Sequence, residues 1–539
     1  MTPSLSEISL YGVGIFFVWR LLNVVFRKSS IPDFKSPAAS SFLFGHLKEG
    51  HGEDGWEFYR GIRDSGCVTK LKGLLGAEQL YIADPLALHH ILVKDQEIYE
   101  ETKMFYALNR LLFGRGLFAI WGDDHKRQRK ILNPVFSMKH MRDVLPVLYP
   151  IAHQLRDGLL AETRGNPEYI DVMAWMGRAA LEYIGQGGLG HSFSTLDKDK
   201  TGDVYANAIK QVLPLITRVF MFTSLLPYIE MLNRGTRRFL VSISPFRLPK
   251  DIRDLTDTLE GVSTEILEKK RSALEKGGDA FEGLAGKGKD IMSVLLKANS
   301  SSDMTEEDLI GHMNTFIFAA TDTTTSALSR ILSLLAEHLD IQSKLREEVT
   351  AARKEHGDLD YDTLQALPYL DAVCRETLRA YPPVAGILRR ATQDTILPLL
   401  YPVTLADGKT VINEIPVAGG TEISVSLLGA NRCKKIWGED AEEWKPSRWF
   451  EPLPESAVKA HLSGVYSQMM TFSAGGRACI GFKFSEMEMK MVLSILIESL
   501  IFEPGLEVSW NIGSVIVPRV KGTGEVFPRL PMKVRPVIV

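Results

Sequence analysis

The sequence predicts a mainly α-helical chain with a smaller β region. Apolar residues between Leu309 and Leu335 recur at steps of three and four, which is the period of one helix face. A second helical pattern runs from Pro368 to Tyr381. From Leu71 to Ala83, glycines alternate with apolar residues before the turn dipeptide Asp84-Pro85, and this pattern predicts a small β-hairpin.

The composition is that of an ordinary globular protein. The chain has 539 residues, of which 45% are hydrophobic and 24% are charged, so it can bury a large core. A net charge of −3 gives no electrostatic reason to expect a nucleic-acid partner. Its four cysteines are far apart and include no CxxC pair, so neither a zinc site nor a disulfide framework is predicted, which fits a reducing compartment.

The first 28 residues predict a membrane anchor. Residues 8–26 are almost continuously apolar and long enough for one membrane-spanning helix, and Arg27-Lys28 after them predict a cytoplasmic C-terminal side. A cleaved signal peptide would carry a positive n-region and an A-x-A-like site, which this segment lacks. A helix lying in the membrane interface is the other alternative, because it would tolerate Arg20 better. Residues 29–55, with prolines and serines, predict a linker.

The loop from Phe472 to Gly481 presents one cysteine between glycines, ahead of an apolar helical run that starts near Met487. Amides and a helix dipole can stabilise a thiolate in such a place. Arg477 supplies a planar fork suited to a carboxylate. The alternative is a buried cysteine in a turn, which is the commonest fate of a free cysteine.

This loop resembles the haem-binding signature of the cytochrome P-450 family, F-x-x-G-x-R-x-C-x-G. All five fixed positions match, at Phe472, Gly475, Arg477, Cys479 and Gly481. The resemblance implies that Cys479 is the axial thiolate of haem b (iron-protoporphyrin IX) and that the other four residues belong to its binding site. It further implies the mainly α cytochrome P-450 fold with a smaller β region, as one catalytic domain over residues 56–539. The motif spellings are most similar to those of fungal membrane-bound members.

The same resemblance places two segments against the haem propionates. The basic stretch from Trp121 to Lys130 would usually be a solvated helix face. In the family, however, a Trp and an Arg four residues apart hold a propionate there, and His125 and Arg129 take these positions. Either Arg389 or Arg390 would reach the second propionate; the sequence does not choose between them, and we place Arg390 in the candidate site.

A polar segment interrupts the long apolar helix pattern at residues 319–324, Ala-Ala-Thr-Asp-Thr-Thr. One interpretation is that the threonine hydroxyls bond to backbone carbonyls four residues earlier. The segment also resembles the oxygen-activation motif A/G-G-x-D/E-T, in which Ala319 faces the haem. That resemblance implies that Asp322 is the acid relay and Thr323 the hydroxyl for proton delivery to dioxygen. Ala320 stands where the family usually has glycine.

Glu376 and Arg379 share a helix face and can pair. Alone this spacing carries no information, because such pairs are common on protein surfaces. It resembles the family's E-x-x-R helix, which pairs with a third residue in a later loop. Arg448, in Trp-Lys-Pro-Ser-Arg-Trp, takes that place and implies a structural role for all three residues.

The resemblance implies a haem-thiolate monooxygenase that inserts one oxygen atom from O2 into an apolar small molecule. A terpenoid or other secondary metabolite is the first substrate class, and an aromatic xenobiotic the second. Electrons would come from NADPH through a separate NADPH–cytochrome P-450 reductase, because no flavin or dinucleotide domain is fused here. We expect a single-pass protein of the endoplasmic reticulum membrane with a cytoplasmic catalytic domain. Segments 384–388 and 511–517 would shape specificity.

Two other functions remain open at this point. One is a haem-thiolate isomerase or dehydratase that rearranges peroxides without a reductase. The presence of both Asp322 and Thr323 argues against it, because such an enzyme needs no proton relay. The other is a non-catalytic, membrane-anchored binder of haem or lipid.

Overall fold

The computed structural model of the chain describes residues 30–197, 204–219, 225–276, 285–298, 304–525 and 527–538, together with Gly14, Val18 and Phe222. The predicted membrane span, residues 8–26, lies outside this part of the chain except for Gly14 and Val18. No helix within the described ranges is both long enough and apolar enough to cross a membrane.

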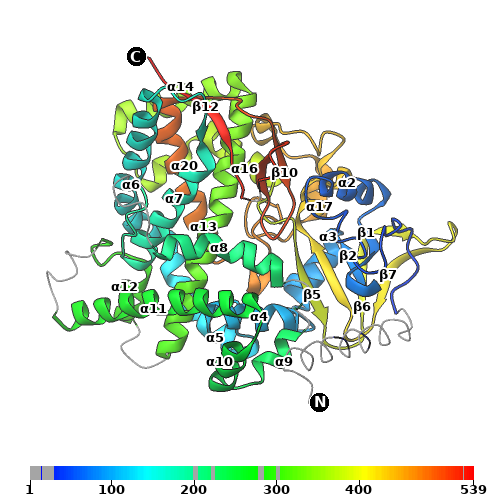
Figure 1. The fold of residues 1–539 in the computed structure, drawn as a ribbon. Coiled ribbons are helices and arrows are strands. Elements are labelled where there is room, and N and C mark those ends of the chain that lie inside the picture. Colours follow the sequence, from blue (N-terminus) through cyan, green and yellow to red (C-terminus); the bar gives the residue numbers. More distant parts are fainter. Residues whose placement is uncertain are drawn as a thin grey trace.

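Helices make up most of the described chain and gather on one side of the molecule (Figure 1). At their centre lies α13 (Glu306–Glu337), which confirms the long predicted helix. The other larger helices are α4 (Lys103–Phe113), α5 (Gly122–Leu132), α6 (Met138–Arg164), α7 (Val172–Tyr183), α8 (Val204–Val219), α10 (Arg234–Ile243), α11 (Arg247–Lys276), α12 (Ile291–Ala298), α14 (Leu339–His356), α16 (Pro368–Ala380) and α20 (Phe482–Ser499).

Shorter helices connect these elements or lie near the strands: α2 (Gly55–Ser65), α3 (Pro85–His89), α9 (Leu226–Glu230), α15 (Tyr361–Ala366), α17 (Leu427–Asn431), α18 (Lys434–Trp437) and α19 (Glu455–Ala460). The start of α13 has a clear local cause. The Thr305 hydroxyl accepts from the Asp308 amide, and the Asp308 carboxylate accepts from the Thr305 amide, so the two residues satisfy each other's backbone donors as a capping box.

The strands form the predicted smaller β region, on the opposite side of the molecule for the most part (Figure 1). The main sheet has the order β1 (Val68–Lys72), β2 (Glu78–Ile82), β8 (Glu422–Ser426), β5 (Gly386–Ala391), β3 (Tyr99–Glu100). Only β2 and β8 run parallel; β1 and β2 are the predicted hairpin, with Val68 opposite Ile82. The remaining pairs and triplet are β6–β7 (Thr395–Thr404, Val411–Val417), β10–β11 (Val508–Asn511, Val517–Val520) and β4–β12–β9 (Ile170–Asp171, Pro531–Pro536, Leu500–Glu503).

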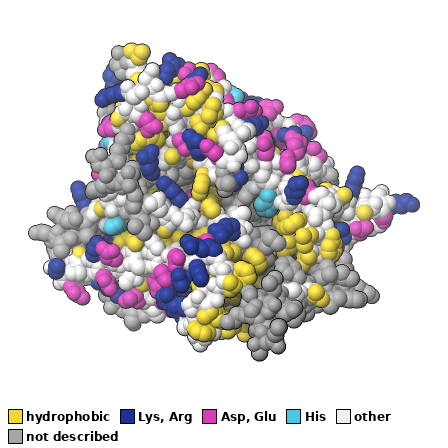
Figure 2. All heavy atoms as spheres, in the orientation of Figure 1, with side chains coloured by type: hydrophobic (Ala, Val, Ile, Leu, Met, Phe, Trp, Pro, Cys, Tyr) yellow, Lys and Arg dark blue, Asp and Glu magenta, His cyan; other side chains and the backbone are white. Residues whose placement is uncertain are grey.

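Part of the segment predicted as a linker packs against the catalytic domain. Phe34 is buried and bridges to Leu405, and the His46 amide donates to the Lys72 carbonyl at 2.8 Å. A different surface feature lies at α9 and α10, where apolar side chains are exposed near basic ones (Figure 2). Met231 and Phe239 are the most exposed of these apolar side chains, and α10 buries none of its residues.

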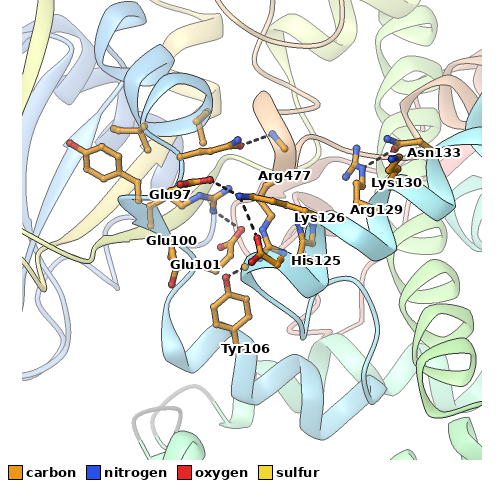
Figure 3. Close-up of a pocket in the computed structure, with 18 residues that line it drawn as sticks. Glu97, Glu100, Glu101, Tyr106, His125, Lys126, Arg129, Lys130, Asn133 and Arg477 are labelled. Atoms are coloured by element: carbon orange, nitrogen blue, oxygen red, sulfur yellow. Dashed lines mark hydrogen bonds and ion pairs between the residues drawn. The ribbon is translucent and has the colours of Figure 1, made fainter. Parts of the chain in front are cut away.

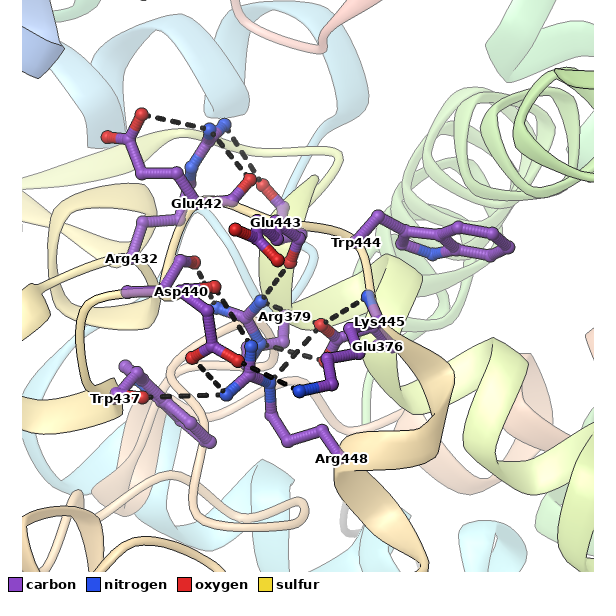
Figure 4. Close-up of polar contacts among 12 residues, drawn as sticks. Glu376, Arg379, Arg432, Trp437, Asp440, Glu442, Glu443, Trp444, Lys445 and Arg448 are labelled. Atoms are coloured by element: carbon purple, nitrogen blue, oxygen red, sulfur yellow. Dashed lines mark hydrogen bonds and ion pairs between the residues drawn. The ribbon is translucent and has the colours of Figure 1, made fainter. Parts of the chain in front are cut away.

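A buried ion network holds the junction of the helical and β sides (Figure 4). Glu376 and Arg379 on α16 are both fully buried and make two hydrogen bonds, at 2.9 and 2.8 Å. Arg379 also donates to the carbonyls of Asn431, Ala441 and Glu443 at 2.7–2.9 Å. The guanidinium is therefore satisfied by one carboxylate and three carbonyls, which a buried charge requires.

Arg448 joins the network as the resemblance implied. Its Nε donates to Glu376 at 3.3 Å, while its two terminal nitrogens reach the carboxylate and the carbonyl of Asp440, each at 2.9 Å. Trp449 Nε1 donates to Glu376 at 3.1 Å. Asp440, which the sequence did not single out, thus supplies the second carboxylate for Arg448.

Asn431 carries this network to the cysteine loop. Its carbonyl accepts from Arg379, its side-chain oxygen accepts from the Met470 amide at 2.7 Å, and its side-chain nitrogen donates to the Thr471 hydroxyl at 2.8 Å. The Thr471 hydroxyl in turn donates to the Leu378 carbonyl on α16 at 2.7 Å. The backbone that leads into Phe472 is therefore positioned by the buried pair.

We expect Arg379→Met to destabilise the protein by about 3–5 kcal/mol, because Glu376 would keep a buried charge with fewer partners. Urea unfolding measures the change. Arg142→Met is the matched control, since Arg142 pairs with Asp362 on the surface and its loss should matter little. Equal destabilisation by the two substitutions would contradict the structural role of the network.

Candidate haem site

The cysteine loop follows a tightly bonded turn. The Cys479 amide donates to the Phe472 carbonyl at 2.9 Å, so Phe472 and Cys479 close the loop. Gly475 has φ +68°, and a Cβ there would lie 1.8 Å from the Leu92 carbonyl, so backbone packing already requires glycine. A Cβ on Gly481 would meet only the Phe136 ring, at 3.8 Å, so its surroundings are open. Helix α20 begins directly after Gly481, at Phe482, five residues before the predicted Met487.

The Cys479 side chain is accessible to solvent, whereas Cys67, Cys374 and Cys433 are buried, and neighbouring protein groups partly desolvate its thiol. Burial raises the pKa of Cys479, while a hydrogen bond from the Gly481 amide and the positive charge of Arg129 act in the opposite direction. A coordinating metal deprotonates a thiol outright, so a metal ion above Cys479 would fit this environment.

Basic residues from three segments line a nearby cavity of about 460 Å³ (Figure 3). His125 and Arg129 come from α5, Arg389 from β5, and Arg477 from the cysteine loop. Arg129 donates to the Ala478 carbonyl at 2.7 Å, which places its guanidinium beside the backbone of Cys479. Arg129 thus lies both in the lining of the cavity and next to the cysteine loop.

Carboxylates of Glu97, Glu100, Glu101 and Asp123 also line this cavity, but its basic residues still lower one another's pKa. Burial, followed by Arg477 and Arg129, lowers the pKa of His125 to about 3, so the imidazole is neutral at pH 7. The pKa of Arg129 is lowered by burial and by Arg477, and that of Arg477 by burial and by Arg389. A bound anion would relieve this repulsion. The residues present thus fit the two carboxylates of haem b.

Each arginine is also held by the protein. Arg477 donates to the Tyr106 hydroxyl at 3.0 Å and to the Ile120 carbonyl at 2.9 Å. Arg389 pairs with Glu101 at 2.7 Å, and burial raises the pKa of Glu101 against the pull of this arginine. Such bonds fix the orientation of each guanidinium before any ligand binds.

The structure brings Arg389 rather than Arg390 to the cavity. Successive side chains of β5 point to opposite faces of the sheet, and only Arg389 is among the residues that line this cavity. Arg390 is not among the residues that line this cavity, and its contact with a propionate stays a prediction. Sequence reasoning also missed Glu101 and Tyr106, because their partners are distant in the chain and no local pattern marks them.

The central helix carries the predicted polar segment as continuous α-helix. The Thr323 hydroxyl donates to the Ala319 carbonyl at 2.7 Å, and Thr321 and Thr325 make the same bond four residues back. Back-bonding therefore describes the threonines in this structure. Asp322 differs, because none of the described residues hydrogen-bonds its carboxylate and burial raises its pKa to about 7. A carboxyl with that pKa can release and regain a proton near neutral pH.

The segments predicted to shape specificity meet at this helix. The Ser326 hydroxyl of α13 donates to the Ile516 carbonyl at 2.6 Å, and the Ile516 amide donates to the Pro383 carbonyl at 2.8 Å. The chain on either side of Pro383 and Ile516 thus lies next to α13, three residues beyond Thr323.

The chain is similar to known proteins over most of its length. A family model described as Cytochrome P450 matches residues 41–512. Cytochrome P450 monooxygenase 81 of Postia placenta is 47% identical over 514 residues, which is 94% of this chain and 93% of the relative. Cytochrome P450 monooxygenase 91 of the same fungus is 43% identical and covers 99% of both chains. The ganoderic acid synthetase of Ganoderma lucidum is 42% identical and covers 96% of both.

We expect Asp322→Asn to change the pH dependence of stability. The pKa of about 7 in the folded protein lies above the ordinary 3.8, so the folded state binds this proton more tightly. Between about pH 4 and pH 7 the free energy of unfolding of the wild type should fall relative to the variant, by no more than about 4 kcal/mol, and then stay level.

Urea unfolding of the holoprotein at a series of pH values measures this difference. Asp123→Asn is the control, because the Asp123 side chain is fully exposed. Parallel stability curves for the wild type and Asp322→Asn would mean that Asp322 titrates normally.

Proposed function

The chain belongs to the cytochrome P450 family and is a monooxygenase with a haem cofactor, and we propose that it inserts one oxygen atom from O2 into an apolar secondary metabolite. A terpenoid is the first substrate class to test and an aromatic xenobiotic the second. The observation that carries the proposal is the contact of Arg129 with the Ala478 carbonyl, because it joins the cation-lined cavity to the cysteine.

Cys479 is the proposed axial ligand of haem b. When bound, a thiolate-ligated haem supplies the redox chemistry that activates dioxygen. Arg129, Arg389 and Arg477 bind the two propionates, and neutral His125 can donate one hydrogen bond to them. Phe472, Gly475 and Gly481 hold the backbone of the loop in place, and Ala319 faces the porphyrin from α13.

Asp322 and Thr323 form the proposed proton relay. Asp322 carries a proton near neutral pH because of its burial, and it regains that proton from water after release. The Thr323 hydroxyl leaves the Ala319 carbonyl to donate toward the reacting oxygen and then returns. Rotation about a single side-chain bond exchanges these two partners, so the relay requires no change in the backbone.

NADPH is the proposed electron source, through a separate NADPH–cytochrome P450 reductase. We also propose that residues 1–28 anchor the protein in the endoplasmic reticulum membrane, with a linker over 29–55 and a cytoplasmic catalytic domain. The exposed apolar side chains of α9 and α10 support contact of this domain with a membrane surface (Figure 2). The name of the relative from Ganoderma lucidum, a ganoderic acid synthetase, supports testing metabolites before xenobiotics.

Two measurements separate this proposal from its alternatives. Expression with a reductase, followed by profiling of which candidate metabolites gain oxygen, tests the oxygenase reaction itself. A product that forms equally without NADPH and reductase would favour the isomerase or dehydratase. The absence of any oxidised product across a broad apolar panel would favour a binder without catalysis.

Cys479→Ala should abolish the carbon-monoxide difference band that marks a thiolate-ligated haem, because no other ligand is proposed on that side of the iron. Difference spectra of the reduced protein measure this band. Cys374→Ala is the control, since Cys374 is buried on α16 and should leave the band in place. A band that survives in Cys479→Ala would refute the ligand assignment.

Thr323→Ala should leave haem binding intact but lower the product formed per NADPH by about tenfold or more, because proton delivery loses its hydroxyl. The missing electrons should appear as hydrogen peroxide. Thr325→Ala is the matched control, because it removes the same kind of back-bond from α13. Equal coupling in both variants would refute the relay role of Thr323.

A further inference from the structure

Arg330 is a buried cation on α13 that no carboxylate contacts directly. It is 9% exposed, its Nε has no hydrogen-bond partner, and no ion pair joins it to any of the described residues, although Glu337 favours its charged form from a longer distance. Three aromatic rings surround its guanidinium instead. The guanidinium carbon lies 3.8 Å from the ring centre of Trp510, 4.1 Å from that of Tyr381 and 5.7 Å from that of Trp56.

This environment makes the rings the main support of the charge. Burial lowers the pKa of Arg330 to about 9, which shows the cost of removing it from water. A desolvated cation over an aromatic face is stabilised by about 2 kcal/mol or more. The neighbouring Arg432 shares Trp56 and Tyr381, at 5.4 and 5.3 Å, but it also reaches Glu442 at 3.6 Å. Arg330 therefore depends on its aromatic contacts more than Arg432 does.

The three rings come from three separate segments. Trp56 lies at the start of α2, Tyr381 directly follows α16, and Trp510 is in β10. Trp56 Nε1 donates to the Trp510 carbonyl at 2.6 Å, and the rings of Trp56 and Tyr381 meet edge to face at 5.7 Å. Arg330 thus lies where α13 meets the β10–β11 hairpin and the residue after α16.

The turn of this hairpin reaches the helix face that carries Thr323. Ser326 holds the Ile516 carbonyl, and Arg330 lies one helical turn beyond Ser326. Because residues three, four and seven apart share a helix face, Thr323, Ser326 and Arg330 lie along one side of α13. The residues between β10 and β11 are therefore held on both sides. Trp510 packs against the Arg330 guanidinium, and the Ile516 carbonyl accepts a hydrogen bond from Ser326.

We propose that Arg330 is a positioning residue whose cation–π contact with Trp510 fixes the turn at residues 512–516 and thereby the wall of the substrate site beside Thr323. That residues 512–516 border a substrate site rests on the proposed function. The cation–π contact between Arg330 and Trp510 can be tested without a substrate. Substitution of a purely structural arginine would change stability alone. Substitution of Arg330 should also change the order of the turn and the binding of molecules that reach it.

The variants are Arg330→Met, which keeps length and loses charge, and Arg330→Lys, which keeps the cation. Arg346→Met is the control, because Arg346 is a partly buried arginine, which donates to the carbonyls of Ile497 and Leu500, but it lies away from the hairpin on α14. All are full-length proteins with haem. Hydrogen exchange of residues 508–520 reports the order of the turn. Titrations with imidazole and with 4-phenylimidazole, which both ligate haem iron, are followed at the Soret band. The affinity for the larger ligand reports whether the wall of the substrate site is intact.

In Arg330→Met we expect exchange in residues 512–516 to become about tenfold faster, because Trp510 loses its cation–π contact with α13. We expect 4-phenylimidazole to bind about fivefold more weakly while imidazole binding is unchanged, because only the larger ligand needs an ordered wall. Arg330→Lys should lie close to the wild type. If Arg330→Met does not fold, Ser326→Ala removes the other support of the turn and should shift both measurements in the same direction.

Unchanged hairpin exchange in Arg330→Met, or in Ser326→Ala where that variant replaces it, would overturn the proposal. So would an equal change in Arg346→Met, or an Arg330→Lys variant that behaves like Arg330→Met. A wild-type protein without a haem Soret band would refute the proposed function instead, and the exchange comparison would still decide whether Arg330 holds the turn.

Discussion

The fully buried pair of Glu376 and Arg379 is the constraint on which the rest of the site depends. Removing two charges from water is costly, so the pair is stable only because Asn431, Ala441 and Glu443 turn their carbonyls toward the guanidinium. Those carbonyls belong to the chain that leads to the cysteine loop. The contacts that stabilise the buried guanidinium therefore also fix the backbone that leads to the cysteine loop.

Unlike the buried pair, several charged or titratable groups of the candidate site lack partners that satisfy them in the described part of the chain. Asp322 has no hydrogen-bond partner among the described residues, and the cations of the cavity lower one another's pKa. A folded protein tolerates such groups where a ligand or a proton transfer will use them. Arg330 is an intermediate case, since aromatic faces compensate its charge and tie the C-terminal hairpin to α13.

Sequence reasoning worked best where a local pattern has one physical solution. The apolar spacing from Leu309 to Leu335 predicts the helix that the structure shows as α13, Glu306–Glu337. The predicted start of the β1–β2 hairpin, Leu71, lies three residues after its first residue, Val68. Alternating glycines and apolar residues mark a turn better than they mark the first residue of a strand. The sequence leaves Arg389 and Arg390 as alternatives for a related reason: the two arginines are adjacent, and only the folded chain brings Arg389 into the lining of the cavity.

By itself, the sequence determined the family, and it marked the cysteine loop and the polar segment of α13 as a candidate site, because each is a short local pattern. Only the tertiary structure decided which cations gather beside Cys479, that Asn431 connects the buried pair to the loop, and that Arg330 lies among Trp56, Tyr381 and Trp510. These contacts join segments up to several hundred residues apart. Their energy comes from burial that exists only after the chain has folded, so no local pattern encodes them.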